Sequence, residues 1–155
     1  MIKRGLYLDD IRTPNSHEWT VVRNYEEFVN EIKKWGLEAF DTISLDHDLG
    51  ETAMIEYYNN VKENFTIDYN NIIEKTGYDA AKYLVAEAIS CKKELPQIYV
   101  HSANPIGTGN IIGYVNNYYK NYKIPLKCVH VEIDHHIDRD LIMSHEERIK
   151  KWKKK

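Results

Sequence analysis

The most constraining feature of the sequence is a set of short, mainly apolar runs that end abruptly in polar residues. Residues 5–8, 42–45 and 97–100 are such runs, and each is followed at once by aspartate or histidine. Uninterrupted runs are typical of buried strands in parallel sheets, whereas the alternating run at 128–133 is typical of an edge strand. A further β-branched run at residues 19–22 completes five predicted strands.

Amphipathic segments stand between and after these runs. Asn24 and Thr76 are good helix N-caps, and each is followed three positions later by an acidic residue, which is the capping-box pattern. Strands that alternate with helices pair in parallel, so the sequence predicts one α/β domain over residues 1–155 with helices on both faces of its sheet. Four helices are predicted: residues 25–35, 77–88, 111–119 and about 144–155, the last ending in lysines.

The segment between Gly50 and Thr76 is about twenty-five residues long, which is unusual for a connection in a compact domain. It is polar and rich in tyrosine and asparagine, and a helix is predicted around residues 54–63. The domain therefore carries an insert at about residues 51–75. Since the insert directly follows the most acidic strand end, two interpretations stay open: an active-site lid and a decorative insertion.

Charge and composition exclude several classes of protein. Lys and Arg number 21 against 24 Asp and Glu, a net charge of −3, which is not the basic balance that neutralises the phosphates of duplex DNA. No apolar run is long enough for a transmembrane helix, and the N-terminus lacks a signal-peptide pattern, so no membrane partner is expected. The two cysteines, Cys91 and Cys128, are too few for a disulfide framework, and we expect a cytoplasmic protein with reduced thiols.

The residues that follow the predicted strands carry the chemistry. Functional crevices in open α/β sheets lie beyond the carboxyl ends of the strands. Asp9 and Asp10 follow the first strand and Asp46 follows the third. Carboxylates gathered at one rim repel each other unless a cation lies among them, and Mg²⁺ prefers oxygen ligands. We therefore predict that these three aspartates bind Mg²⁺ or Mn²⁺, rather than merely ending strands and capping helices.

Two histidines, His47 and His101, follow the third and fourth strands at equivalent positions. An imidazole beside a metal can act as a general acid or base, so we predict that both transfer protons. Four polar residues, and a glycine whose amide precedes a predicted helix, lie at the same rim and are predicted to contact the substrate. This predicted substrate-binding set is Arg12, Asp48, Ser102, Asn104 and Gly107.

Four segments in this order resemble the cyclic-phosphate processing receiver domains: LYLDDIRTP at 6–14, SLDHDLG at 44–50, TGYD at 76–79 and VHSANP at 100–105. That family is an offshoot of the response-regulator receivers, found in bacteria and phages, and is predicted to act on cyclic phosphates in RNA or nucleotide metabolism. The resemblance covers roughly residues 5–120. It implies a flavodoxin-like, five-stranded parallel sheet in the order 2-1-3-4-5.

The residues and the resemblance together predict a metal-dependent phosphoesterase. Its substrate would be a cyclic or terminal phosphate on a nucleotide, an RNA end or an ADP-ribose-like ligand. Signalling receivers have a lysine at the end of strand five, where this sequence reads Val131-Glu132-Ile133-Asp134. Two alternatives stay open: a signalling receiver that is phosphorylated on Asp46, and a non-catalytic module that sequesters a nucleotide.

Overall fold

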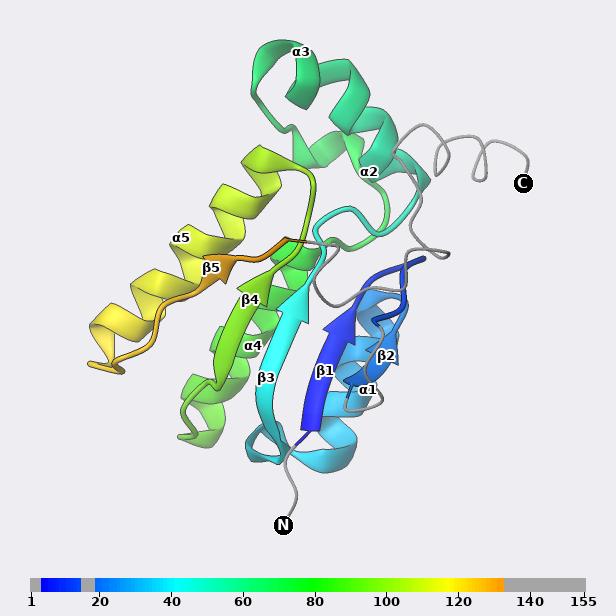
Figure 1. The fold of residues 1–155 in the computed structure, drawn as a ribbon. Coiled ribbons are helices and arrows are strands. Elements are labelled where there is room, and N and C mark those ends of the chain that lie inside the picture. Colours follow the sequence, from blue (N-terminus) through cyan, green and yellow to red (C-terminus); the bar gives the residue numbers. More distant parts are fainter. Residues whose placement is uncertain (1–3, 15–18, 133–155) are drawn as a thin grey trace.

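The computed structural model describes residues 4–14 and 19–132, which form a parallel sheet with helices packed against it (Figure 1). Its strand order is β2-β1-β3-β4-β5, and every neighbouring pair is parallel. The predicted fold class and strand order are therefore confirmed. The strands are β1 (Arg4–Leu8), β2 (Trp19–Val22), β3 (Phe40–Leu45), β4 (Gln97–Val100) and β5 (Val129–His130).

Three long helices lie on one face of the sheet in Figure 1, where they contact one another in the order α1, α4, α5. The sequence predicts helices on both faces, whereas these three helices share one face. The remaining predicted helix, at about residues 144–155, lies outside the described residues. None of the helices in the described ranges is long and apolar enough to cross a lipid bilayer. The three are α1 (Tyr25–Trp35), which leads into the 3₁₀ turn η1 (Leu37–Ala39), α4 (Gly77–Cys91) and α5 (Pro105–Asn121).

The predicted helix caps are present. The Asn24 side chain accepts a hydrogen bond from the Glu27 amide at 2.8 Å. Thr76 and Asp79 form a complete capping box at the start of α4. Each cap satisfies amides that have no partner within the helix, and so fixes where the helix leaves the sheet.

Two predicted boundaries are wrong. α5 begins at Pro105 rather than at residue 111, because Asn104 caps it and proline is well suited to the first helical position. The glycines at 107 and 109, which favour a loop in the sequence, lie inside its first turns. β5 is shorter than predicted, since residues 131 and 132 lie beyond the strand and residue 133 lies outside the described range.

The insert continues from β3 as one helical segment that lies beyond the carboxyl end of the sheet (Figure 1). A helix is predicted there at residues 54–63, and the helical segment extends further, over residues 51–64. It consists of α2 (Glu51–Glu56), the π-helical turn η2 (Tyr57–Val61) and α3 (Lys62–Asn64), and the short 3₁₀ turn η3 (Tyr69–Asn71) follows.

Strand alternation divides the sheet into two faces. Side chains such as Leu8, Ile43 and Val100 join the core beneath α1, α4 and α5, and all are fully buried. Their neighbours in sequence point to the opposite face. In register, Leu8 pairs with Leu45 and Leu45 with Val100. The residues that follow these three positions therefore emerge at one edge of the sheet.

Candidate functional site

Three carboxylates meet at the carboxyl end of β1 and β3. One oxygen from each of Asp9, Asp10 and Asp46 lies within 4.8 Å of the others, and we call this group the acidic cluster. A backbone hydrogen bond of 2.9 Å from the Asp46 amide to the Leu8 carbonyl joins the two strand ends. The structure thus brings together the three residues that the sequence predicts as metal ligands.

The donor set of the acidic cluster fits a hard divalent cation. Mg²⁺ binds oxygen at about 2.1 Å, so two ligands on opposite sides of the ion are about 4.2 Å apart. The separations of up to 4.8 Å in the cluster need only a small contraction to reach that spacing. Asp9 and Asp46 are buried and Asp10 is partly exposed, so the cluster combines fixed ligands with access from solvent.

The Asp9 carboxylate is held in place by the loop after β1. Its Oδ1 accepts hydrogen bonds from the backbone amides of Ile11 at 2.9 Å and Arg12 at 2.8 Å. These bonds close a tight turn that fixes the carboxylate before any ligand binds. The sequence Asp-Asp-Ile-Arg therefore builds the ligand and its support together.

Arg12 adds a buried cation beside the acidic cluster. Its side chain is 2% exposed, and Nη1 lies 3.4 Å from Asp9 Oδ2. The buried Nε has no hydrogen-bond partner within the described part of the chain. Arg23, which the sequence analysis does not single out, supports the turn by donating to the Arg12 carbonyl at 2.6 Å and to Thr13 Oγ1 at 2.7 Å. A buried guanidinium with an unused donor is suited to binding a phosphoryl oxygen.

His101 connects the acidic cluster to the sheet. Its Nε2 lies 3.2 Å from Asp9 Oδ2 and its Nδ1 lies 2.7 Å from Ser44 Oγ. Because an ionised carboxylate can only accept, Nε2 carries the hydrogen, and Nδ1 is left to accept the serine hydroxyl in the neutral ring. The imidazole stacks on the Tyr7 ring with centroids 4.2 Å apart and planes 12° apart.

Tyr7 is a buried residue close to the negative charges of the acidic cluster. Burial raises the pKa of the Tyr7 hydroxyl well above its ordinary value, and the negative charges of Asp9 and Asp46 raise it further. Tyr7 therefore stays neutral across the physiological pH range and serves as a packing surface for His101.

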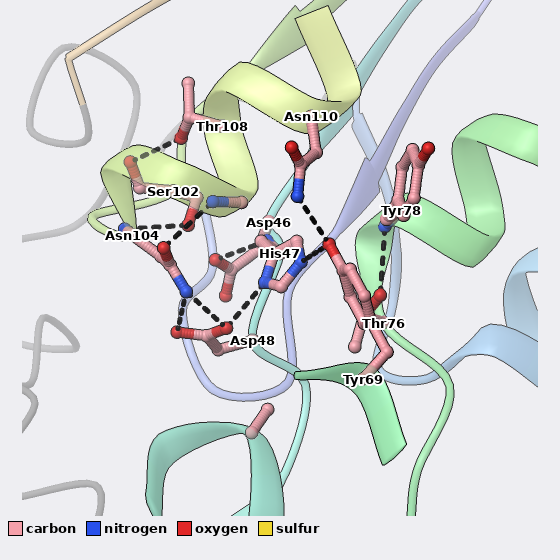
Figure 2. A network of polar contacts seen from close by, with 12 residues as sticks. Asp46, His47, Asp48, Tyr69, Thr76, Tyr78, Ser102, Asn104, Thr108 and Asn110 are labelled. Atoms are coloured by element: carbon pink, nitrogen blue, oxygen red, sulfur yellow. Dashed lines mark hydrogen bonds and ion pairs between the residues drawn. The ribbon is translucent and has the colours of Figure 1, made fainter. Parts of the chain in front are cut away.

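His47 lies in a second group of polar residues, which we call the His47 network (Figure 2). Its Nδ1 lies 2.6 Å from Asp48 Oδ1 and its Nε2 lies 3.0 Å from the Tyr69 hydroxyl. The Asn110 amide nitrogen donates to the same hydroxyl at 3.0 Å. Because the Asp48 carboxylate can only accept, Nε2 of the neutral ring is the acceptor and Tyr69 donates its hydrogen to it. Nδ1 therefore carries the ring hydrogen and donates it to Asp48.

The Tyr69 hydroxyl can hold this arrangement because it keeps its proton. Burial raises its pKa to about 12, with a smaller opposing contribution from the Asn110 hydrogen bond. Tyr69 belongs to η3 of the insert, so the insert contributes a side chain to the site. Both interpretations of the insert, an active-site lid and a decorative insertion, stay predictions.

The remaining predicted residues also join the His47 network. Asn104 donates to both oxygens of Asp48, at 3.1 and 3.4 Å, and its Oδ1 accepts the Gly107 amide at 2.9 Å. The Ser102 hydroxyl oxygen accepts a hydrogen bond of 3.0 Å from the backbone amide of Asn104. The Gly107 amide is thus already bonded within the protein, and substrate contact by these four residues stays a prediction.

Two glycines, Gly77 and Gly107, allow α4 and α5 to approach the loop after β3 closely. A Cβ at Gly107 would lie 2.6 Å from two atoms of the His47 ring, and a Cβ at Gly77 would lie 2.9 Å from the Asp46 carbonyl carbon. The Gly77 amide donates to the His47 carbonyl at 2.9 Å. Because these two positions have no side chain, the starts of α4 and α5 pack directly against the loop after β3, where His47 is fully buried.

The predicted residues therefore fall into two adjoining groups. Asp9, Asp10 and Asp46 form the acidic cluster with Arg12 and His101 beside it, and the others form the His47 network. The two groups meet where Asp46 Oδ1 accepts the His47 amide at 2.9 Å. Besides Arg23, sequence reasoning missed four residues that complete the site: Tyr7, Ser44, Tyr69 and Asn110.

Comparison with protein families identifies one match. The family model described as the cyclic-phosphate processing receiver domain matches residues 4–117, which include all the predicted site residues. Comparison with curated proteins and with solved structures gives no significant match.

Proposed function

Because the chain belongs to the family of cyclic-phosphate processing receiver domains, we propose that it is a metal-dependent phosphoesterase. It would open a cyclic phosphate or remove a terminal phosphate from a nucleotide, an RNA end or an ADP-ribose-like ligand. The observation that carries the proposal is the acidic cluster, in which three carboxylates converge beside a buried arginine and a histidine.

Asp9, Asp10 and Asp46 would hold Mg²⁺ or Mn²⁺. When bound, such an ion polarises a phosphoryl oxygen and lowers the pKa of a coordinated water. The protein contributes the fixed geometry: two backbone amides orient Asp9, and a strand-to-strand hydrogen bond orients Asp46. Arg12 would bind a phosphoryl oxygen through its unused Nε donor and so stabilise charge that develops on the phosphate.

His101 is the better of the two predicted proton-transfer residues. Its Nε2 hydrogen points at Asp9, and Ser44 holds the other ring nitrogen, so the ring is oriented beside the reacting phosphate. His47 is also bonded at both nitrogens, but its side-chain partners are Asp48 and Tyr69 rather than a residue of the acidic cluster, and its ring is packed against Gly107. We propose that His47 acts as a positioning residue that holds the Asp46 loop, and that His101 transfers the proton.

The signalling alternative has less support. Asp46, the position of the phosphoacceptor in receivers, is 1% exposed. The residues that follow β5 are Val131 and Glu132, where signalling receivers have a lysine.

Cys91 and Cys128 are free thiols, which fits our proposal that the enzyme acts in the reducing cytoplasm.

The test is a hydrolysis assay with 2′,3′-cyclic nucleotides, nucleoside monophosphates and RNA that ends in a cyclic phosphate, each with Mg²⁺ or Mn²⁺. Asp46→Asn should lower turnover at least a hundredfold, since a metal supplies several kcal/mol of stabilisation. Asp41→Asn is the matched control, because Asp41 is an exposed residue of the same strand. A stable phosphate adduct from acetyl phosphate that is lost in Asp46→Asn would favour the signalling receiver instead. Tight nucleotide binding without turnover would favour the sequestering module.

A further inference from the structure

A pocket lies on the sheet face opposite α1, α4 and α5. Its volume is about 170 Å³. Three aromatic rings line it, from Tyr7 on β1, Trp19 on β2 and Tyr99 on β4. A cavity of about 150 Å³ is enough to bind benzene, whereas sites for drug-sized ligands span about 300–1,000 Å³. The pocket therefore has room for one ring system rather than for a whole nucleotide.

The aromatic wall of the pocket is built into the sheet. Trp19 pairs in register with Gly5, where a Cβ would lie 2.6 Å from the indole ring. The absence of a side chain at Gly5 lets the indole pack directly on β1. The Tyr7 ring meets the Trp19 ring edge to face, with centroids 5.4 Å apart and an interplanar angle of 73°. The wall thus consists of fixed rings rather than loose surface side chains.

The pocket and the acidic cluster share one residue. His101 lines the pocket, and the same ring donates to Asp9. Ser44, which also lines the pocket, holds the other nitrogen of that ring. A ligand in the pocket and a phosphate at the acidic cluster would therefore be separated by the width of a single imidazole. A base and a phosphate that are joined by a ribose can bridge such a separation.

The lining chemistry suits a nucleobase. Aromatic side chains stack on the faces of bases, while polar groups bond to their edges. Tyr7, Trp19 and Tyr99 offer the aromatic surface, and Glu132 offers a carboxylate that can accept a hydrogen bond from a base amino group. We propose that this pocket binds the base of a nucleotide whose phosphate lies at the acidic cluster. The inference rests on the proposed function, and it names the substrate class of that site.

The first experiment uses the full chain with Mg²⁺ and two probes that differ only in the base: adenosine 5′-monophosphate and ribose 5-phosphate. Stacking on an aromatic side chain is worth about 1–3 kcal/mol per base, so the nucleotide should bind about tenfold to a hundredfold more tightly. Trp19→Leu should remove that preference. Trp35→Leu is the matched control, because Trp35 is a partly exposed tryptophan on α1, and it should preserve the preference. Tyr99→Leu is the second variant if Trp19→Leu does not fold.

Tryptophan fluorescence measures binding in the pocket directly, because Trp19 lines it. The chain has three tryptophans, so the double variant Trp35→Phe/Trp152→Phe leaves Trp19 alone. Adenosine 5′-monophosphate should quench its fluorescence saturably, and ribose 5-phosphate should not. Equal affinity for the two probes, or a preference that survives Trp19→Leu, would overturn the pocket assignment.

The outcomes separate this inference from the proposed function. If both probes bind equally and with the same dependence on Mg²⁺, the pocket assignment fails while the proposed metal site stands. A second outcome is that the nucleotide quenches Trp19 fluorescence with an affinity that neither Mg²⁺ nor Asp46→Asn changes. In that case the pocket binds a base and the proposed metal-dependent function fails. If neither probe binds, the pocket assignment fails.

Discussion

A single added methyl group at Gly107 tests how tightly His47 is held. Gly107 lies in the first turn of α5, and a Cβ there would lie 2.6 Å from two atoms of the His47 ring. The ring has no room to retreat, because it is fully buried and bonded to Asp48 on one side and to Tyr69 on the other. Gly107→Ala should therefore strain the site.

The expected size of this effect follows from two opposing contributions. Overpacking a well-packed region costs about 1–3 kcal/mol. Alanine is a better helix former than glycine by up to about 1 kcal/mol, and less than that in a first turn. Gly107→Ala should thus lower the free energy of unfolding by about 1–2 kcal/mol. For a domain of this size that corresponds to a fall in Tm of about 2–8 °C.

The same helix supplies the control. Gly113 is exposed on α5, and a Cβ there would have no atom within 4 Å. Gly113→Ala should therefore raise the free energy of unfolding by about 0.5–1 kcal/mol. Both variants are measured by urea unfolding, alone and combined with His47→Ala, which removes the ring that the new methyl group would strike. Equal effects of Gly107→Ala in the presence and absence of the His47 ring would contradict the predicted clash between the new methyl group and that ring.

Three further predictions concern the same region. Gly77→Ala should destabilise the fold by about 3 kcal/mol or more in urea unfolding, because its Cβ would meet the rigid Asp46 backbone rather than a side chain. Tyr69→Phe should cost about 1–3 kcal/mol in the same assay, since it leaves His47 Nε2 without its buried partner. Burial raises the pKa of Glu56, but its hydrogen bonds within the insert together outweigh that effect and hold the pKa below its ordinary value. Its stabilising contribution is therefore present at neutral pH and lost as the pH falls through that lowered pKa, so the stability lost in Glu56→Gln should shrink towards zero in acid.

The strands and most helices follow from local patterns in the sequence. The apolar runs predict β1 to β4 because burial dominates there, and the pairs beginning at Asn24 and Thr76 predict where α1 and α4 begin. The start of α5 was missed because Gly107 and Gly109 favour a loop on propensity alone. The tertiary reason for Gly107 is the approach of His47, which no local pattern contains.

The site is predictable only where strand ends define it. Asp9, Asp10 and Asp46 converge because neighbouring parallel strands end side by side. Strand alternation places Ser44 and Tyr7 on the face opposite the core, and so could have suggested their contact with His101. Tyr69 could not be found this way, because its position depends on how the insert folds back over the strand ends.

The thermal response to a divalent cation tests directly whether the acidic cluster is a metal site. If the acidic cluster binds Mg²⁺ or Mn²⁺, saturating the wild-type protein at about one hundred times the Kd should add about 2.7 kcal/mol of stability. That corresponds to a rise in Tm of about 5–10 °C for a chain of this length. Asp46→Asn should abolish most of the rise, and Asp41→Asn, at an exposed residue of the same strand, should keep it. An equal rise in the wild type and in Asp46→Asn, or no rise in either, would contradict a metal site at the acidic cluster.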